Sequence, residues 1–307
     1  MKPALFDDLI ALDARLASHG FPRFSKWWRR ALRSFLTTGK RRLVLRVGRR
    51  GGKSLTLAKF VVAVAMHASL PLPPGERAII AWLSIDLREA GARLVSLRAM
   101  FDALGIAYTA RGDEIELHDR PVTIRCYPAS YRAVVGFSSP LVICDEVSRW
   151  RDSETGSNPA AAVVDSISPT LATLDGFLVL ASAPWSDADY HATEFEKGNT
   201  PEQHTAHAPT WEANPTLSRD ALRKLAGDER SFLRDYAAIP QGEVSSPFEP
   251  GEVDALVTTK EPARRFVKGV RYGMTLDVGL RRDRTGAIIF HRELVDGPFG
   301  PVDVIVC

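Results

Sequence analysis

The sequence predicts an α/β fold in which a parallel sheet is covered by helices on both faces. Three observations predict it. Short apolar runs alternate with helical stretches, the first run leads into a glycine-rich loop, and a helix follows that loop. The 307 residues are 45% hydrophobic and 25% charged, which is ordinary globular composition. This length fits one large domain or two modest ones.

The core strands are predicted where apolar runs are bounded by turn residues, at 41–47, 77–85, 139–146 and 176–184. Helices are predicted within the basic segment 1–40 and at 53–70, 86–105 and about 160–171. Asp86 is a possible cap of the third of these helices, and Gly105 closes it. Three runs with alternating or β-branched residues indicate short strands, possible members of an inserted hairpin, at 106–110, 114–119 and 121–129.

The chain becomes polar after Pro184. Residues 214–244 predict two helices, the first capped near Ser218, and a proline-containing linker follows. A strand, a turn and a second strand are then predicted between residues 270 and 294, and the chain stops inside a further strand.

Basic residues are concentrated in the first quarter of the chain. The net charge is only +3, but no Asp or Glu occurs from Ala14 to Gly75. The stretch contains Arg15, Arg23, Lys26, Arg29, Arg30, Arg33, Lys40, Arg41, Arg42, Arg46, Arg49, Arg50, Lys53 and Lys59. This distribution predicts a polyanionic partner, or alternatively a solvated face balanced by acids elsewhere in the fold.

The cysteines and the apolar runs exclude two classes of protein. Cys126, Cys144 and Cys307 show no metal-ligand spacing, and an odd count without a signal peptide fits a reducing cytosol. The longest apolar run is too short to span a bilayer, so no membrane partner is expected.

The loop from Arg46 to Ser54, "RVGRRGGKS", is similar to a phosphate-binding loop but deviates from the usual G-x-x-x-x-G-K-[ST] pattern. Val47 stands where the first glycine belongs, and Gly48 comes one position late. The other parts are present: Gly51 and Gly52 permit close approach of a phosphate, Lys53 reaches the β- and γ-phosphates, and Ser54 ligates Mg²⁺. The loop is therefore a variant ATP site, a damaged one, or a basic loop that contains glycine.

Two acids end the apolar run "LVICDE". Asp145 is predicted to hold Mg²⁺ through water, and Glu146 to polarise the attacking water. The alternative is a strand that ends at the surface with solvated acids. Ser182, in "SAP", ends the next run and is predicted to sense the γ-phosphate, unless it only precedes a turn. We expect Lys53 and the acid pair to meet at the ends of adjacent strands.

Together these motifs resemble the large terminase subunit of tailed bacteriophages, the motor that packages DNA into the capsid. Arg49 matches the arginine of the family's variant phosphate loop, Asp145–Glu146 its acid pair, and "SAP" its coupling motif. Asn214 and Pro215 resemble the Asn-Pro segment behind the ATPase core. "MTLDVGLRRDRTGAIIF" is similar to the first strand pair of the family's nuclease, with Asp277 as first metal ligand and Asp283 as a nearby second acid.

The resemblance implies a P-loop NTPase (ASCE-type) parallel sheet flanked by helices, followed by the beginning of an RNase H-like α/β domain. The implied boundaries are a basic helical segment at 1–40, the ATPase domain at 41–245, a linker at 246–268 and the incomplete nuclease-like domain at 269–307. The implied cofactors are ATP and Mg²⁺, with the nucleotide contacted by Arg49, Arg50, Gly51, Gly52, Lys53, Ser54 and Ser182. Glu146 and Arg49 would be catalytic, and Ser54, Asp145, Asp277 and Asp283 would be metal ligands.

The resemblance also implies that ATP hydrolysis drives translocation of double-stranded DNA into a procapsid. The implied partners are this DNA, a portal protein, a small terminase subunit and further copies of the chain in a ring, in the cytoplasm of a host cell that carries the phage or prophage. A DNA-dependent ATPase or helicase without a packaging role is one alternative, and a truncated DNA-binding remnant without activity is another.

Two departures from the family pattern change these expectations. Gly136 keeps the glycine of an Arg-Gly pair that often precedes the acids, but Val135 replaces the arginine. Arg132 on the same segment is the candidate for a trans-acting catalytic finger. With only Asp277 and Asp283, a two-metal nuclease site cannot close, so nuclease activity is not expected from the chain as it ends.

Overall fold

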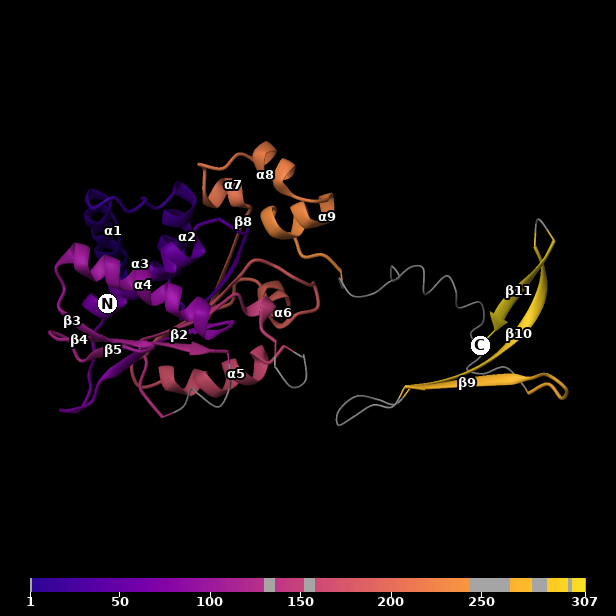
Figure 1. Cartoon of the computed structure of the whole chain (residues 1–307). Helices are drawn as coiled ribbons and strands as arrows, with labels where there is room; N and C mark the ends of the chain where they lie inside the picture. Colours follow the sequence, from indigo (N-terminus) through magenta and orange to yellow (C-terminus); the bar gives the residue numbers. More distant parts are fainter. Residues whose placement is uncertain are drawn as a thin grey trace. The chain divides into compact units, whose positions relative to one another are not determined.

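The structure is a computed structural model of the chain, and it describes residues 2–129, 136–151, 158–242, 266–277, 286–297 and 300–306. The chain divides into two compact units, Met1–Ser245 and Ser246–Cys307. Figure 1 shows the first unit as a helix-covered sheet. No helix within the described ranges combines the length and the apolar character that a membrane crossing requires.

The first unit is built on an eight-stranded sheet with the order β3-β4-β5-β2-β6-β7-β1-β8. The strands β5, β2, β6, β7, β1 and β8, in this spatial order, pair in parallel. At one edge, β3 and β4 form an antiparallel hairpin, and β4 pairs antiparallel with β5. The strands are β1 (Arg42–Val47), β2 (Ala78–Ser84), β3 (Tyr108–Arg111), β4 (Glu114–Leu117), β5 (Val122–Pro128), β6 (Leu141–Asp145), β7 (Phe177–Ser182) and β8 (Gln203–Ala208). The predicted core strands and inserted hairpin are thereby confirmed.

Helices cover both faces of this sheet, as the alternation of runs predicts. One face packs against α1 (Lys2–Ser18), α2 (Lys26–Thr37), α3 (Lys53–His67) and α4 (Leu87–Leu104). The other packs against α5 (Ala160–Ile167), its 3-10 extension (Ser168–Leu171) and α6 (Tyr190–Glu196). Apolar strand residues alternate between the two cores: Leu43 and Leu45 face the first, and Val44 faces the second.

Two elements after Pro184 are missing from the sequence prediction. The helix α6 and the edge strand β8 both lie in polar sequence, and β8 reads "QHTAHA". β8 pairs in parallel with β1. The backbone of β1 thus stabilises a strand that the polar sequence of β8 does not predict. The two helices predicted beyond it are shorter pieces: α7 (Thr210–Ala213), α8 (Arg219–Leu225), α9 (Glu229–Ser231) and a π-helical turn (Phe232–Tyr236). Ser218 caps α8 as predicted.

The expectation that the phosphate-loop strand and the acid strand are adjacent is wrong. β7 lies between β1 and β6, with Arg46 opposite Ser182 and Asp145 opposite Ala181. Chain order does not reveal this insertion, because β7 follows both strands in sequence. All three strands are parallel, so their carboxyl ends still meet at one edge of the sheet.

A buried ion pair joins α1 to α3. Lys59 Nζ lies 2.7 Å from Asp13 Oδ1, and the two side chains are 0% and 1% exposed. Lys59 also donates to the Pro22 carbonyl at 2.6 Å, and Asp13 accepts from the Phe24 N–H and from Arg23. This network fastens the basic N-terminal helices to the helix that follows the phosphate loop.

The second unit contains three antiparallel strands in the order β11-β10-β9. They are β9 (Tyr272–Asp277), β10 (Gly286–Gly297) and β11 (Gly300–Val306). The two predicted strands are present, together with the further strand near the end of the chain, whereas the predicted turn between the first two lies outside the described residues. Three antiparallel strands are not sufficient to identify an RNase H-like domain, so that part of the predicted fold stays a prediction.

Candidate active site

The phosphate loop ends where α3 begins. Gly52 occupies the N-cap position with a φ of 85°, a left-handed conformation in which glycine is unstrained. The first bond of the helix runs from the Thr56 N–H to the Gly52 carbonyl at 3.0 Å. The amides of Lys53, Ser54 and Leu55 precede it and have no partner inside the helix, so they and the helix dipole favour an anion at this point.

Three successive carbonyls of the loop are held by side chains from two segments, the α7 segment and α2. The Arg49 carbonyl accepts from Thr210 Oγ1 at 2.8 Å, and the Arg50 carbonyl accepts from Asn214 Nδ2 at 3.0 Å. The Gly51 carbonyl accepts from Trp28 Nε1 at 2.8 Å. Engaged in this way, the three carbonyl oxygens face protein donors, and the backbone of the loop is fixed at three successive residues.

The late glycine of the loop has a packing role. A Cβ atom at Gly48 would lie 2.4 Å from Thr210 Oγ1 and 2.6 Å from the Tyr236 carbonyl, distances that no side chain tolerates. Gly48 is thus required by the segment that packs against the loop. The displaced glycine therefore has its own structural support, and nucleotide binding by the loop stays a prediction.

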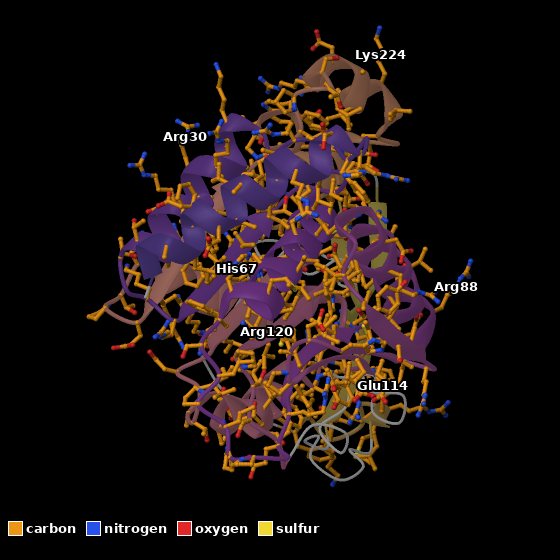
Figure 2. The ribbon with its side chains drawn as sticks, turned by 90° about the vertical axis from the view of Figure 1, so that its left-hand side faces the viewer. Arg30, His67, Arg88, Glu114, Arg120 and Lys224 are labelled. Atoms are coloured by element: carbon orange, nitrogen blue, oxygen red, sulfur yellow. The ribbon has the colours of Figure 1, made fainter. Side chains whose placement is uncertain are left out.

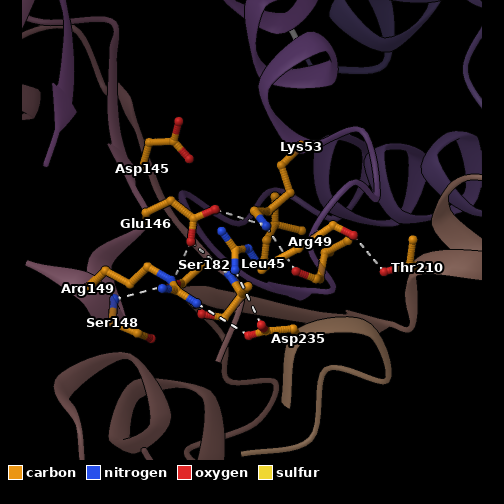
Figure 3. Close-up of polar contacts among 12 residues, drawn as sticks. Leu45, Arg49, Lys53, Asp145, Glu146, Ser148, Arg149, Ser182, Thr210 and Asp235 are labelled. Carbon is orange, nitrogen blue, oxygen red and sulfur yellow. Dashed lines mark hydrogen bonds and ion pairs between the residues drawn. The ribbon is translucent and has the colours of Figure 1, made fainter. Parts of the chain in front are cut away.

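Lys53 and Glu146 meet across β7. Lys53 Nζ lies 3.1 Å from Glu146 Oε1 and donates to the Val47 carbonyl at 3.0 Å (Figure 3). The lysine side chain is 5% exposed and the glutamate side chain 23% exposed. Glu146 has a φ of 55°, an uncommon conformation for a residue other than glycine, and such strain is typical of functional sites.

The Glu146 carboxylate is held in its ionised form. Burial opposes ionisation, but the charge and hydrogen bond of Lys53 and the N–H of Ala183 outweigh it, so the pKa of Glu146 lies below its ordinary value. Its second oxygen accepts from the Ala183 N–H at 3.1 Å and from Ser182 Oγ at 3.3 Å. Ser182 is fully buried, and its hydroxyl group holds the Glu146 carboxylate from the protein interior.

Asp145 is buried with one unsatisfied oxygen. Its Oδ2 accepts from Arg93 Nε at 3.1 Å, while Oδ1 has no hydrogen-bond partner. Burial and the neighbouring Glu146 charge raise the pKa of Asp145 to about 6, although Arg93 and Lys53 act against the rise. A buried carboxylate oxygen without a partner fits the water shell of a Mg²⁺ ion, and P-loop sites need few protein ligands for this metal. The described residues hold no cluster of three or more His, Cys, Asp or Glu placed for a metal.

Asp145→Asn is expected to stabilise the nucleotide-free protein. The folded pKa of about 6 exceeds the ordinary 3.8, so the native state binds the proton more tightly than the unfolded chain. Stability therefore falls as pH rises from about 4 to 6, and the full penalty, up to about 3 kcal/mol, is present at neutral pH. Thermal unfolding in EDTA should show a higher Tm than wild type at about pH 7.5 and a smaller difference at about pH 5. Asp165→Asn, which changes an exposed acid on α5, should leave the Tm as in wild type at both pH values. A Tm of Asp145→Asn below that of wild type at neutral pH would contradict the expectation.

An arginine cluster lies beside the loop and shares one carboxylate. Asp235 contacts Arg49, Arg149 and Arg234 at 3.3, 3.4 and 3.0 Å. Burial opposes ionisation of Asp235, but Arg234 and the other two arginines outweigh it and hold its pKa below the ordinary value. Arg149 and Arg234 also stack on Trp185, at 4.6 and 4.5 Å from the ring centre. One carboxylate cannot neutralise three guanidinium groups, so the cluster carries excess positive charge next to the anion side of the loop.

The predicted site residues are only partly brought together. Lys53 contacts Glu146, Ser54 follows Lys53 in the first turn of α3, and Arg50 is exposed with a φ of 64°; the roles of Ser54 and Arg50 stay predictions. Arg49 pairs with Asp235, and no contact with Glu146 accompanies that pairing in the described structure. Arg132 and Asp283 lie outside the described residues. Asp277 ends β9 in the second unit, where its role as a metal ligand stays a prediction.

Several residues of the site are absent from the sequence prediction. Arg149 lies three positions after Glu146, and this closeness is the one signal that could have indicated it. Asp235 is 186 positions from Arg49, and no local pattern connects them. The sequence favours a core position for Trp28 over a role in the site. Trp28 is buried, and in addition it binds the loop.

The sheet, the phosphate loop at the start of α3 and the acid pair at the end of β6 define a P-loop NTPase fold. Solved structures of similar fold include large terminases of bacteriophages. That of HK97 is 17% identical, with a TM-score of 0.60 over 98% of this chain and 67% of that one. The ATPase domain of Thermus phage P74-26 is 17% identical, with a TM-score of 0.52 over 67% and 91%. The large terminase of a thermophilic bacteriophage, in complex with ADP, is 13% identical, with a TM-score of 0.57 over 70% and 53%.

No protein-family model and no curated protein matches the chain. At these identities the likeness shows the fold, which is the fold that the motifs predict.

Proposed function

We propose that this chain is a Mg²⁺-dependent ATPase of the large terminase type. The observation that carries the proposal is the contact between Lys53 Nζ and Glu146 Oε1, because it brings the lysine of the candidate phosphate loop against the candidate base. The similar fold of the thermophilic phage's large terminase, solved in complexes with ADP and with ATP-gamma-S, supports nucleotide binding by this chain.

ATP binding would redistribute the contacts of Lys53. The triphosphate accepts the helix amides, and Lys53 moves from Glu146 to the phosphate oxygens. Glu146 then loses its cation, and the pKa of its carboxyl group rises toward the range in which a base is effective. Ser182 and the Ala183 N–H keep the carboxylate in place. Water attacks the γ-phosphorus, its proton passes to Glu146, the bond to the β-phosphate oxygen breaks, and ADP and phosphate are released.

Asp145 and Ser54 would hold Mg²⁺, Asp145 through the oxygen that has no protein partner. When bound, the ion would offset the negative charge of the β- and γ-phosphates. The excess positive charge of Arg49, Arg149 and Arg234, which share Asp235 beside the loop, would act on the same phosphates. Arg132 is proposed as the residue offered to a neighbouring subunit.

We further propose that hydrolysis drives double-stranded DNA into a procapsid, with several copies of the chain in a ring on a portal protein and a small terminase subunit as partner. The large terminases of similar fold and the basic N-terminal helices support this step. A rise in ATP turnover on addition of duplex DNA and purified portal is the expected result, and strand separation of a tailed duplex would favour a helicase instead.

Lys53→Ala is expected to weaken ATP binding about 10- to 100-fold. A hydrogen bond to a charged group contributes about 1.5–3 kcal/mol, and this lysine supplies one to the phosphates. Isothermal titration with Mg-ATP measures the loss, with thermal unfolding as a check that the variant is folded. Lys224→Ala removes an exposed lysine on α8 and should bind as wild type does (Figure 2). Equal affinities for folded Lys53→Ala and wild type would refute the site.

A further inference from the structure

The helix α2 separates its residues into a buried and a basic side. Lys26, Arg29, Arg30 and Arg33 recur at spacings of three and four residues, so they form one stripe along the helix. All four are exposed, and in Figure 2 Arg30 extends away from the molecule into solvent. The opposite side is buried in the core through Trp28, Ala31, Leu32, Phe35 and Leu36.

The charges of this α2 stripe are not neutralised by the surrounding fold. Among the described residues, no carboxylate lies within 4.0 Å of a stripe cation. Arginines of the neighbouring strand behave differently: Arg42 pairs with Glu194, and Arg46 with Glu196. Four uncompensated cations in a row produce a local positive field, which attracts a polyanion and not a single small ligand.

The chemistry of the stripe favours a nucleic acid backbone over an acidic protein. Protein interfaces are built around a buried apolar or aromatic centre, and the stripe contains none. Three of its four cations are arginines, whose planar fork matches phosphate oxygens. Contacts to phosphates position a protein on a duplex without reading its sequence, and this suits a protein that moves along DNA.

The buried side of the same helix contacts the phosphate loop. Trp28 is 2% exposed and donates through Nε1 to the Gly51 carbonyl at 2.8 Å. Trp27 packs edge-on against it, with 4.7 Å between ring centres, and Ser25 caps the helix start at the Trp28 N–H. A displacement of α2 therefore reaches the loop directly through the Trp28 hydrogen bond.

We propose that the α2 stripe binds the phosphate backbone of duplex DNA, and that this binding alters the phosphate loop through Trp28. The inference rests on the proposed ATPase function and adds to it the DNA-contacting surface and a route from that surface to the nucleotide. DNA and ATP then influence each other's affinity by the same factor, because binding linkage is reciprocal.

The binding half is tested with a fluorescent duplex titrated at about 50 to 200 mM salt. In the triple variant Arg29→Gln, Arg30→Gln, Arg33→Gln, the slope of log affinity against log salt should fall by about 0.9 for each lost phosphate contact. Arg88→Gln removes an exposed arginine on α4, on the other side of Figure 2, and should keep the wild-type slope. An unchanged slope in the triple variant overturns the proposal, and so does loss of portal binding with DNA affinity intact.

The coupling half is tested with Trp28→Phe, which keeps an aromatic ring in the core and removes only the donor to Gly51. The affinity of a fluorescent ATP analogue is measured with and without saturating duplex DNA. In wild type the two affinities should differ, and in Trp28→Phe their ratio should approach one while DNA affinity stays as in wild type. A wild-type ratio in this variant overturns the coupling.

Neither measurement requires hydrolysis, which separates this proposal from the ATPase. A protein that binds DNA through the stripe and shifts analogue affinity without turning over ATP would refute the proposed function and leave the inference standing. A protein that hydrolyses ATP, and whose DNA affinity shows no salt-dependent contribution from the α2 stripe, would support the proposed function and refute the inference.

Discussion

Glu146→Gln is expected to bind ATP and to lose its hydrolysis by about 10²- to 10⁴-fold, the contribution of a positioned general base. Glutamine has nearly the shape of glutamate, and its amide oxygen can still accept from the Ala183 N–H. It cannot take a proton from water. It also no longer attracts Lys53, which is then free for the phosphates, so ATP affinity should be equal to or higher than that of wild type.

Single-turnover hydrolysis of labelled ATP with enzyme in excess isolates the chemical step from assembly and product release. Titration with Mg-ATP on the same sample measures binding. Glu76→Gln, an exposed glutamate in a turn, is the matched control and should retain wild-type turnover. If Glu146→Gln hydrolyses ATP at the wild-type single-turnover rate, Glu146 is not the base.

Asp13→Ala is expected to destabilise the protein by about 3–5 kcal/mol, because it leaves the buried Lys59 ammonium without its counter-charge. The same carboxylate accepts from the Phe24 N–H, which would be left unsatisfied as well. The effect should be seen as an earlier urea midpoint with an unchanged slope of unfolding free energy against urea.

The double variant Asp13→Asn, Lys59→Met separates charge burial from packing. It removes both charges, keeps similar volumes and leaves the amide oxygen of Asn at position 13 able to accept from the Phe24 N–H, so it should recover most of the loss. A double variant as unstable as Asp13→Ala would show that the hydrogen bonds, and not the pairing of charges, hold α1 to α3. Asp8→Ala, a half-exposed acid on α1, should cost less than about 1 kcal/mol.

Much of the core could be predicted because its elements carry strong local signals. The run before Arg49 is apolar and ends in glycine, and Lys53 opens a long apolar helix, so β1 and α3 appear where expected. β8 carries no such signal: its residues are polar, and its conformation comes from pairing with β1.

The site could be predicted where its residues are close in sequence and not where they are brought together by the fold. The acid pair and the loop are local motifs, and both converge at the predicted edge. The order of strands at that edge is a property of the whole sheet, so the position of β7 was not readable from chain order. The charge cluster on Asp235 depends on a turn of π-helix far along the chain, for which "FLRDY" gives no indication.

The close packing of Gly48 against Thr210 has a consequence for descent. A side chain at position 48 would meet the backbone carbonyl of Tyr236 at 2.6 Å as well as Thr210 Oγ1, so a smaller residue at 210 would not by itself release the demand for glycine. Related chains that keep this packing of the loop should therefore keep glycine at 48 even where the residue at 210 changes.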